Sequence, residues 1–249
     1  MTKWKLMLTL SLIITVAFSQ NHEIYGSIGY DYPTPTSIVG RYYPQNFIEL
    51  NKSTYSEGYK VKCGYTFLVN SNFGLDLSIG YLQGIKNKLF SEDLFGYNSY
   101  SIKHTNKNYS ITPSIILKTE IGSISPFVKI GASVNFIKLK LNYDIKDYHD
   151  SYWRTREENY SNDYTIGLLS VIGLTYKISD TIFFLTEIQH SSISFFPTKD
   201  KLYIDGKYVN TFTLYDKYDK YHPGSDAYGE TSAFPFNALG FSFGIGFSL

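Results

Sequence analysis

The sequence predicts an all-β fold, an eight-stranded antiparallel up-and-down transmembrane β-barrel with four long extracellular loops. Three observations support this prediction. Residues 239–249 alternate without a break between large apolar side chains at odd positions and Gly or Ser at even positions. Tyr (24) and Phe (18) are abundant, yet mean hydropathy is slightly negative, so the apolar residues are dispersed. After the N-terminus, no run of 18 or more apolar residues offers a spanning helix.

The alternation in 239–249 favours a membrane barrel over a soluble core. On a strand, odd positions form one face and even positions form the other. A barrel in lipid needs large apolar side chains outside and small ones in a narrow lumen. The alternative, a secreted β-sandwich or lipocalin-like barrel, would leave the Gly-rich faces as its core.

Charge and cysteine content exclude several function classes. The 249 residues carry a net charge of +1, so no global field points to nucleic acid or to an acidic partner. The single cysteine, Cys63, has no CxxC partner or His cluster, which argues against a zinc or redox role. The charged and tyrosine-rich run 216–222 lacks the ligand spacing of a calcium loop. We therefore predict no metal and no cofactor.

The N-terminus has the pattern of a secretory signal peptide. Lys3 and Lys5 precede an apolar run from Leu6 to Phe18, and small residues lie three and one before a cleavage point ahead of Gln20. An N-terminal membrane helix is the alternative. We expect a signal peptide at 1–19 and an outer-membrane β-barrel domain at 20–249.

The first half of the chain predicts four strands. Alternation runs through 24–32, through 59–69 after a loop at 33–54, and through 73–81 after a short turn at 70–72. A long polar and aromatic segment at 83–106 then leads to a strand at 108–117. Pro113 lies inside this strand, and because proline removes a ladder donor, we expect a local bulge there.

The second half predicts four more strands. A turn at 122–125 leads to a strand at 128–136, and a long loop at 142–162 precedes a strand at 164–176. The next strand, at 182–189, carries Phe183 and Leu185 on its inner face, where we expect them to fill the periplasmic floor of the lumen.

The last long segment, 196–234, contains a hairpin signal. Tyr203 to Val209 surround Asp205-Gly206, a pair typical of a type I′ turn. Its arm, 201–204, is shorter than the roughly 9–11 residues of a membrane crossing. We therefore expect an extracellular hairpin, followed by the eighth strand.

This topology alternates three short turns with four long loops and places both termini in the periplasm. It also gathers aromatic residues into two belts on the lipid face, as membrane interfaces require. The expected extracellular belt is Tyr30, Tyr32, Tyr59, Tyr81, Tyr109, Phe136 and Tyr164, and the expected periplasmic belt is Phe67, Phe73, Tyr176, Phe184 and Phe247.

The segments 126–132 (PFVKIGA) and 173–180 (GLTYKISD) and the closing strand carry a family resemblance. With the strand count, they make the chain similar to the eight-stranded barrels related to the transmembrane domain of outer-membrane protein A and to the opacity-like porin family. The closing strand resembles their C-terminal sorting strand, although Leu249 stands where Phe is usual. The resemblance implies the outer membrane of a Gram-negative bacterium, with lipid and lipopolysaccharide as partners.

Charged residues on the inner faces predict how the lumen is filled. An eight-stranded barrel is just wide enough for side chains, so we expect interior ion pairs that plug it. A narrow path for small solutes is the alternative. The inward charged residues are Lys60, Lys62, Asp76, Lys118, Lys129 and Glu187.

One short motif suggests an enzyme as an alternative. His190 and Ser192 share the outward parity near the extracellular rim, and their spacing resembles the catalytic pair of the outer-membrane lipid A deacylase. There, Ser attacks an acyl ester with His as base, oriented by an acid, for which Glu230 or Asp226 would have to serve. Ile193 follows Ser192, where that family has Asn.

We predict a non-enzymatic barrel whose loops have a structural or surface-contact role, with an envelope or surface protein as a possible partner class. The Tyr-rich loops resemble other recognition surfaces, in which large amphipathic rings are presented at low entropic cost. The simpler interpretation is that His190 and Ser192 are polar residues at the interfacial end of a strand and have no catalytic role.

Overall fold

The computed structural model describes residues 22–34, 55–94, 98–147, 152–213 and 234–249. The signal-peptide prediction for 1–19 falls outside these residues. No helix long and apolar enough to span a membrane occurs in the part of the chain that the structure describes.

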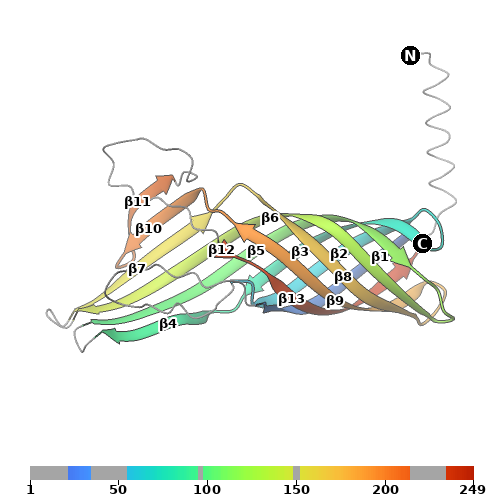
Figure 1. Cartoon of the computed structure of the whole chain (residues 1–249), viewed down its shortest axis with the longest axis horizontal. Helices are drawn as coiled ribbons and strands as arrows, with labels where there is room; N and C mark the ends of the chain where they lie inside the picture. Colours follow the sequence, from blue (N-terminus) through green and yellow to red (C-terminus); the bar gives the residue numbers. More distant parts are fainter. Residues whose placement is uncertain (1–21, 35–54, 95–97, 148–151, 214–233) are drawn as a thin grey trace, which may run out of the picture.

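The described residues form one large antiparallel sheet (Figure 1). Its strands are β1 (His22–Pro33), β2 (Gly58–Leu68), β3 (Phe73–Gly84), β4 (Asn87–Leu94), β5 (Asn98–Lys118), β6 (Ile124–Asp147), β7 (Tyr152–Ser161), β8 (Thr165–Lys177), β9 (Ile182–Phe195), β10 (Lys199–Ile204), β11 (Lys207–Thr213), β12 (Phe234–Pro235) and β13 (Ala238–Ser248).

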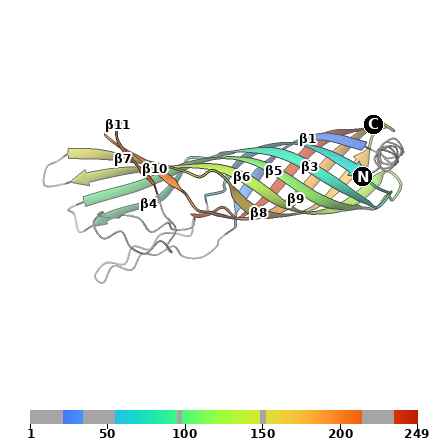
Figure 2. The same ribbon diagram turned by 90° about the horizontal axis from the view of Figure 1, so that it is seen from above.

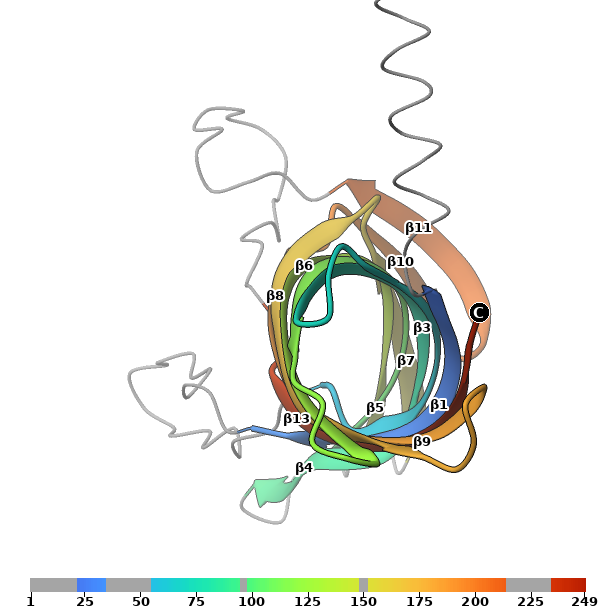
Figure 3. The same cartoon turned by 90° about the vertical axis from the view of Figure 1, so that its right-hand side faces the viewer.

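Eight of the strands close into a barrel, as predicted. They follow the order β6, β8, β9, β13, β1, β2, β3 and β5, and pairing between β5 and β6 completes the ring (Figure 3). All eight correspond to the strands expected from the alternation. The order is that of an up-and-down barrel in which the last strand, β13, pairs with the first, β1.

The faces of the wall are those predicted from parity. Along β13, Phe241, Phe243 and Phe247 point outward and are exposed, whereas Ser242 and Gly246 are buried. Ile28 on the adjacent β1 and Cys63 on β2 also lie on the outer face. An outer wall of this kind is stable only against hydrocarbon, since it exposes bulky apolar side chains from every strand of the ring.

The register brings the predicted aromatic belts together. Tyr81 pairs with Tyr109 and Tyr109 with Phe136, so one belt continues across β3, β5 and β6. At the opposite end, Tyr176 pairs with Phe184. The distance between these belts marks the membrane-spanning part of the barrel.

Two expectations about the strands were wrong. The segments 83–106 and 142–162 are not simply loops, because β3, β4 and β5 cover most of the first, and β6 and β7 cover most of the second (Figure 2). Pro113 also makes no bulge. The β5–β6 register is the same on both sides of it, with Ile111 opposite Val134 and Ser114 opposite Gly131, and only the pairing between these positions is interrupted. Proline removes a donor here without the insertion of an extra residue.

The hairpin prediction in 196–234 is confirmed. β10 and β11 are joined by Asp205 and Gly206, which have φ values of 48° and 75°. A type I′ turn requires positive φ at both central residues, and Asp-Gly meets this requirement at low cost. The hairpin does not cross the membrane. Instead, β10 pairs with β7 beyond the lipid-facing wall.

Candidate functional site: lumen and extracellular extension

The predicted interior ion pairs are confirmed, and they centre on Lys129. Its Nζ lies 2.9 Å from Asp76 Oδ1 and 3.4 Å from Glu187 Oε1. Lys62 contacts the other carboxylate oxygen of Glu187, Oε2. Two lysines and two carboxylates therefore form a charge-balanced network in the lumen, from strands β2, β3, β6 and β9.

Hydroxyl groups complete this network. Tyr25 Oη lies 3.1 Å from both carboxylate oxygens of Asp76 and accepts a hydrogen bond from Lys129. Thr66 donates to Asp76 at 2.7 Å, and Ser242 donates to Glu187 at 3.1 Å. Because buried charges are stable only when they are paired and hydrogen-bonded, these contacts hold the lumen closed at this level.

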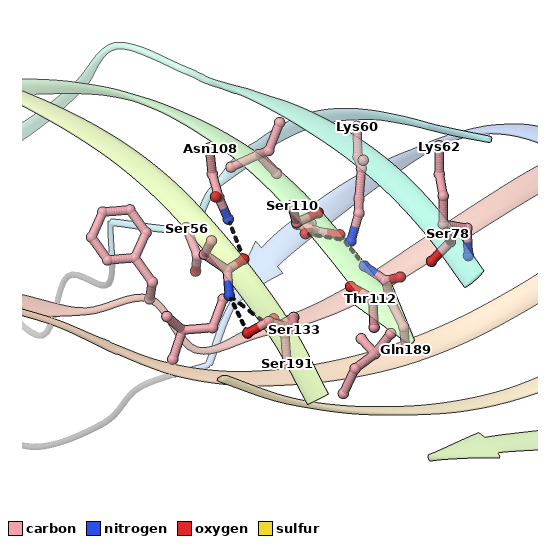
Figure 4. A pocket seen from close by; sticks show the side chains of 17 residues that line it. Ser56, Lys60, Lys62, Ser78, Asn108, Ser110, Thr112, Ser133, Gln189 and Ser191 are labelled. Carbon is pink, nitrogen blue, oxygen red and sulfur yellow. Dashed lines mark hydrogen bonds and ion pairs between the residues drawn. The ribbon is translucent and has the colours of Figure 1, made fainter. Parts of the chain in front are cut away.

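The remaining interior charges are also paired. Lys118 contacts Glu23 near the periplasmic end. Nearer the extracellular end, Asp31 lies 3.6 Å from Lys60 and accepts a 2.9 Å hydrogen bond from Gln189. Figure 4 shows Lys60 and Gln189 in the lining of the chamber at this level. The polar chamber around these groups has a volume of about 40 Å³. At ~15 Å³ for each water molecule, it holds only a few waters.

An apolar cluster closes the periplasmic end. Phe183 and Leu185 are each 3% exposed and pack there, which confirms that they form the floor. The cluster contains Tyr25, Leu68, Ile116, Phe127, Leu169, Val171, Phe183 and Leu185.

A second apolar cluster closes the extracellular end. Phe195 and Phe236 are almost fully buried, with ring centroids 5.7 Å apart. Tyr55 packs against Phe236 and, edge to face, against His104. The core of this cluster is Ile137, Leu139, Leu141, Ile193, Phe195 and Phe236. Buried apolar side chains of the described residues therefore lie on both sides of the polar chamber.

Beyond this second apolar cluster, which is called the cap below, β6 has polar side chains on its outer face and apolar side chains on its inner face. This is the reverse of the lipid-facing wall. Up to Phe136, β6 turns large apolar residues outward, but beyond it Lys138 and Lys140 point outward while Leu139 and Leu141 are buried. This inversion marks the height at which lipid ends and water begins. The water-exposed sheet beyond the inversion, built from β4, β7, β10, β11 and the ends of β5 and β6, is called the extracellular extension below (Figures 1 and 2).

The inner face of the extracellular extension holds a carboxyl cluster. Glu158 is buried and accepts hydrogen bonds from Tyr143 at 2.8 Å and Tyr160 at 2.7 Å, and Arg156 pairs with it. Asp200 is also buried, and its Oδ1 has no hydrogen-bond partner among the described residues. Burial, and then the charge of Glu158, raise the pKa of Asp200 to about 6.

We expect Asp200→Asn to strengthen docking of the β10–β11 hairpin at neutral pH. The folded Asp200 holds its proton up to a higher pH than the unfolded chain, so hairpin stability falls as pH rises from about 4 to about 6. The Asn variant has no charge to bury and loses this dependence. Hydrogen exchange of the β10 amides should be slower than in the parent at pH 7.5 and equal at pH 4, while Asp180→Asn in a periplasmic turn changes neither. Equal exchange of parent and variant at pH 7.5 would contradict this account.

The structure places His190 and Ser192 on the outer face of β9, as parity predicted. Both are exposed, and neither side chain has a hydrogen bond within the described part of the chain. Glu230 and Asp226, the candidate acids, lie outside the described residues, as does the run 216–222. The described geometry thus places two polar side chains at the extracellular end of the wall. It brings no acid to them.

The lumen network and the cap differ in how well they could be predicted. Inward parity identified six of the interior charges, but not Glu23 and Asp31, which pair with Lys118 and Lys60. The cap and the extracellular extension were also missed. The sequence of 137–141 contained a signal for the cap and for the extracellular extension. There Ile137, Leu139 and Leu141 alternate with two lysines, so the apolar residues have the parity that faces the lumen, whereas in the wall they have the parity that faces lipid. Alternation that continues but exchanges its faces indicates a strand that leaves the membrane.

Comparison with known proteins supports the fold. No protein-family model matches the chain, and no curated protein matches it in sequence. The outer-membrane protein OprG of Pseudomonas aeruginosa matches in structure with 11% identity and a TM-score of 0.52, over 92% of this chain and 96% of OprG. A major outer-membrane protein of Thermus thermophilus matches with 11% identity and a TM-score of 0.52, over 93% of this chain and 100% of that one.

Proposed function

We propose that this outer-membrane β-barrel is a surface-contact protein whose function lies in its extracellular extension and loops. The lumen filled with side chains is the single observation that carries the proposal. Charge pairs and two apolar clusters fill the interior, and the remaining polar chamber of about 40 Å³ holds only a few waters.

The size of the extracellular extension supports the same proposal. β5 and β6 are 21 and 24 residues long, about twice the ~9–11 residues needed to cross a bilayer. Their upper halves, with β4, β7 and β10, make a hydrogen-bonded sheet outside the lipid-facing wall. Fixing this many residues in a sheet costs conformational entropy, and a connection without a function of its own would not need to be ordered in this way.

The proposal is tested on intact cells that lack the native gene. One strain produces the full chain, and another produces a variant in which a four-residue turn replaces 142–157, so that the paired residues Leu141 and Glu158 are kept. Both barrels should show the same heat-modifiable gel mobility and the same resistance to detergent. Attachment to wells coated with laminin and collagen should fall to the level of the empty strain only in the variant. Equal attachment of all three strains would overturn the surface-contact role.

The channel and enzyme alternatives predict different results. A solute path predicts discrete conductance in planar bilayers, whereas the filled lumen predicts none. If the protein is a lipid A deacylase, cells with Ser192→Ala should have lipid A with one more acyl chain than cells with the parent chain, detected by mass. We expect the lipid A profile to be the same with the parent chain, with Ser192→Ala and without the gene.

A further inference from the structure

Lysine side chains line the outer face of the extracellular extension in two adjacent rows. In the first row, Lys107 on β5 lies directly opposite Lys138 on β6, and Lys138 is followed by Ser161 on β7 and Lys199 on β10. In the second row, Lys140 is followed by Asn159 and Lys201. Like charges placed directly opposite on a sheet are destabilising, so this arrangement favours an anion between them.

These rows border a groove of about 470 Å³. Lys107, Lys138, Lys140 and Lys201 line it, with polar groups from Asn159 and Tyr203, and no carboxylate is among its lining residues. Lys140 is paired with Glu157. The other three lysines have no ion-pair partner in the described part of the chain, so the groove has a net positive charge.

The groove lies at the height of lipid headgroups. Tyr109 and Phe136 are paired in the extracellular aromatic belt, and Lys107 and Lys138 are two residues further along the same strands on the same face. Two residues of strand correspond to ~7 Å. Because aromatic belts lie at the membrane–water interface, the lysines reach the layer that contains the phosphates of the outer leaflet.

We propose that this groove binds the phosphate groups of an anionic outer-leaflet lipid. The lysine ammonium groups supply the charge, and the amide of Asn159 and the hydroxyl of Tyr203 supply further donors. The acyl chains of the same lipid lie against the apolar wall below. The proposal rests on the groove and the belt and is independent of the surface-contact role of the loops.

The test uses the full mature chain in nanodiscs of uncharged phosphatidylcholine, with diphosphoryl lipid A as the probe. Retention of the probe is measured by native mass spectrometry for the parent and for the triple variant Lys107→Gln/Lys138→Gln/Lys201→Gln. At ~1 kcal/mol for each lysine near the surface, the triple variant should bind about 100-fold more weakly. Lys86→Gln/Lys177→Gln/Lys207→Gln, with the same change in charge at other exposed sites, should bind like the parent.

Further arms distinguish the source of the phosphate. Monophosphoryl lipid A should bind more weakly than the diphosphoryl form, and inorganic phosphate at the same phosphate concentration should not displace either. Heat-modifiable mobility verifies that each variant is folded. Equal binding by the parent and the groove variant overturns the proposal. Displacement by inorganic phosphate, or groove-dependent binding of a sulfated polysaccharide without binding of lipid A, also overturns it.

Discussion

Lys129→Met is expected to lower the free energy of unfolding by about 3–5 kcal/mol, the range for removing one partner of a buried ion pair. Lys129 is the only described cation within 4 Å of Asp76, and it also contacts Glu187. Without it, Lys62 is the one described cation left for the two carboxylates, and it contacts only Glu187. The measurement is urea unfolding of the reconstituted protein, followed by tyrosine fluorescence and gel mobility.

A charge-balanced double variant separates electrostatics from packing. Lys129→Met/Asp76→Asn retains the Lys62–Glu187 pair and removes the uncompensated charge, so most of the lost stability should return. Lys140→Met breaks an exposed pair with Glu157 and should cost less than ~1 kcal/mol. If the double variant were as unstable as Lys129→Met, lost packing and not charge would be the cause.

Gly246→Val is expected to cost about 3 kcal/mol, at the upper end for overpacking. A Cβ on Gly246 would lie 2.1 Å from Cζ of Phe183, which is directly opposite on β9. Gly64 opposite Tyr25 and Gly173 opposite Phe127 are arranged in the same way. Each of these three aromatic rings thus lies over a glycine of the neighbouring strand, and any side chain there must displace the ring.

Gly26→Val is the matched control for this prediction. Gly26 lies on the outer face of β1, and a Cβ there would meet no atom within 4 Å. We expect its unfolding midpoint in urea to equal or exceed that of the parent, because Val favours strands and faces lipid here. Equal losses in Gly246→Val and Gly26→Val would show that glycine is needed for its backbone and not for the space it leaves.

The sequence was sufficient to predict the wall of the barrel but not its extracellular half. Two-residue alternation located all eight strands because lipid on one side and a narrow lumen on the other impose opposite side-chain sizes. The same alternation continues through Ile137, Leu139 and Leu141 with exchanged faces, and a search for outward apolar residues ends at Phe136. The extracellular extension is a sheet in water, so its polar side chains face outward and its apolar side chains face inward, as in soluble proteins.

For the candidate sites, the sequence predicted which face a side chain is on but not which side chains come together. Parity predicted that Lys62, Lys129 and Glu187 point inward, but the partner of each depends on register across the ring, which a single strand does not specify. The lysine groove combines β5, β6, β7 and β10, with residues as distant in sequence as Lys107 and Lys201. Only the observed pairing of these strands brings them together.

The central claim is that the bulky face of every barrel strand is in contact with lipid, and Cys63 allows a direct measurement. It is the single cysteine of the chain and lies exposed on the outer face of β2. A nitroxide on Cys63 in bilayers should collide often with oxygen and rarely with a water-soluble nickel chelate. A nitroxide at Ser71→Cys in the Cys63→Ser background, in the exposed turn after β2, should show the reverse. Equal access of the nickel chelate to both labels would contradict the lipid-facing wall and the functions proposed from it.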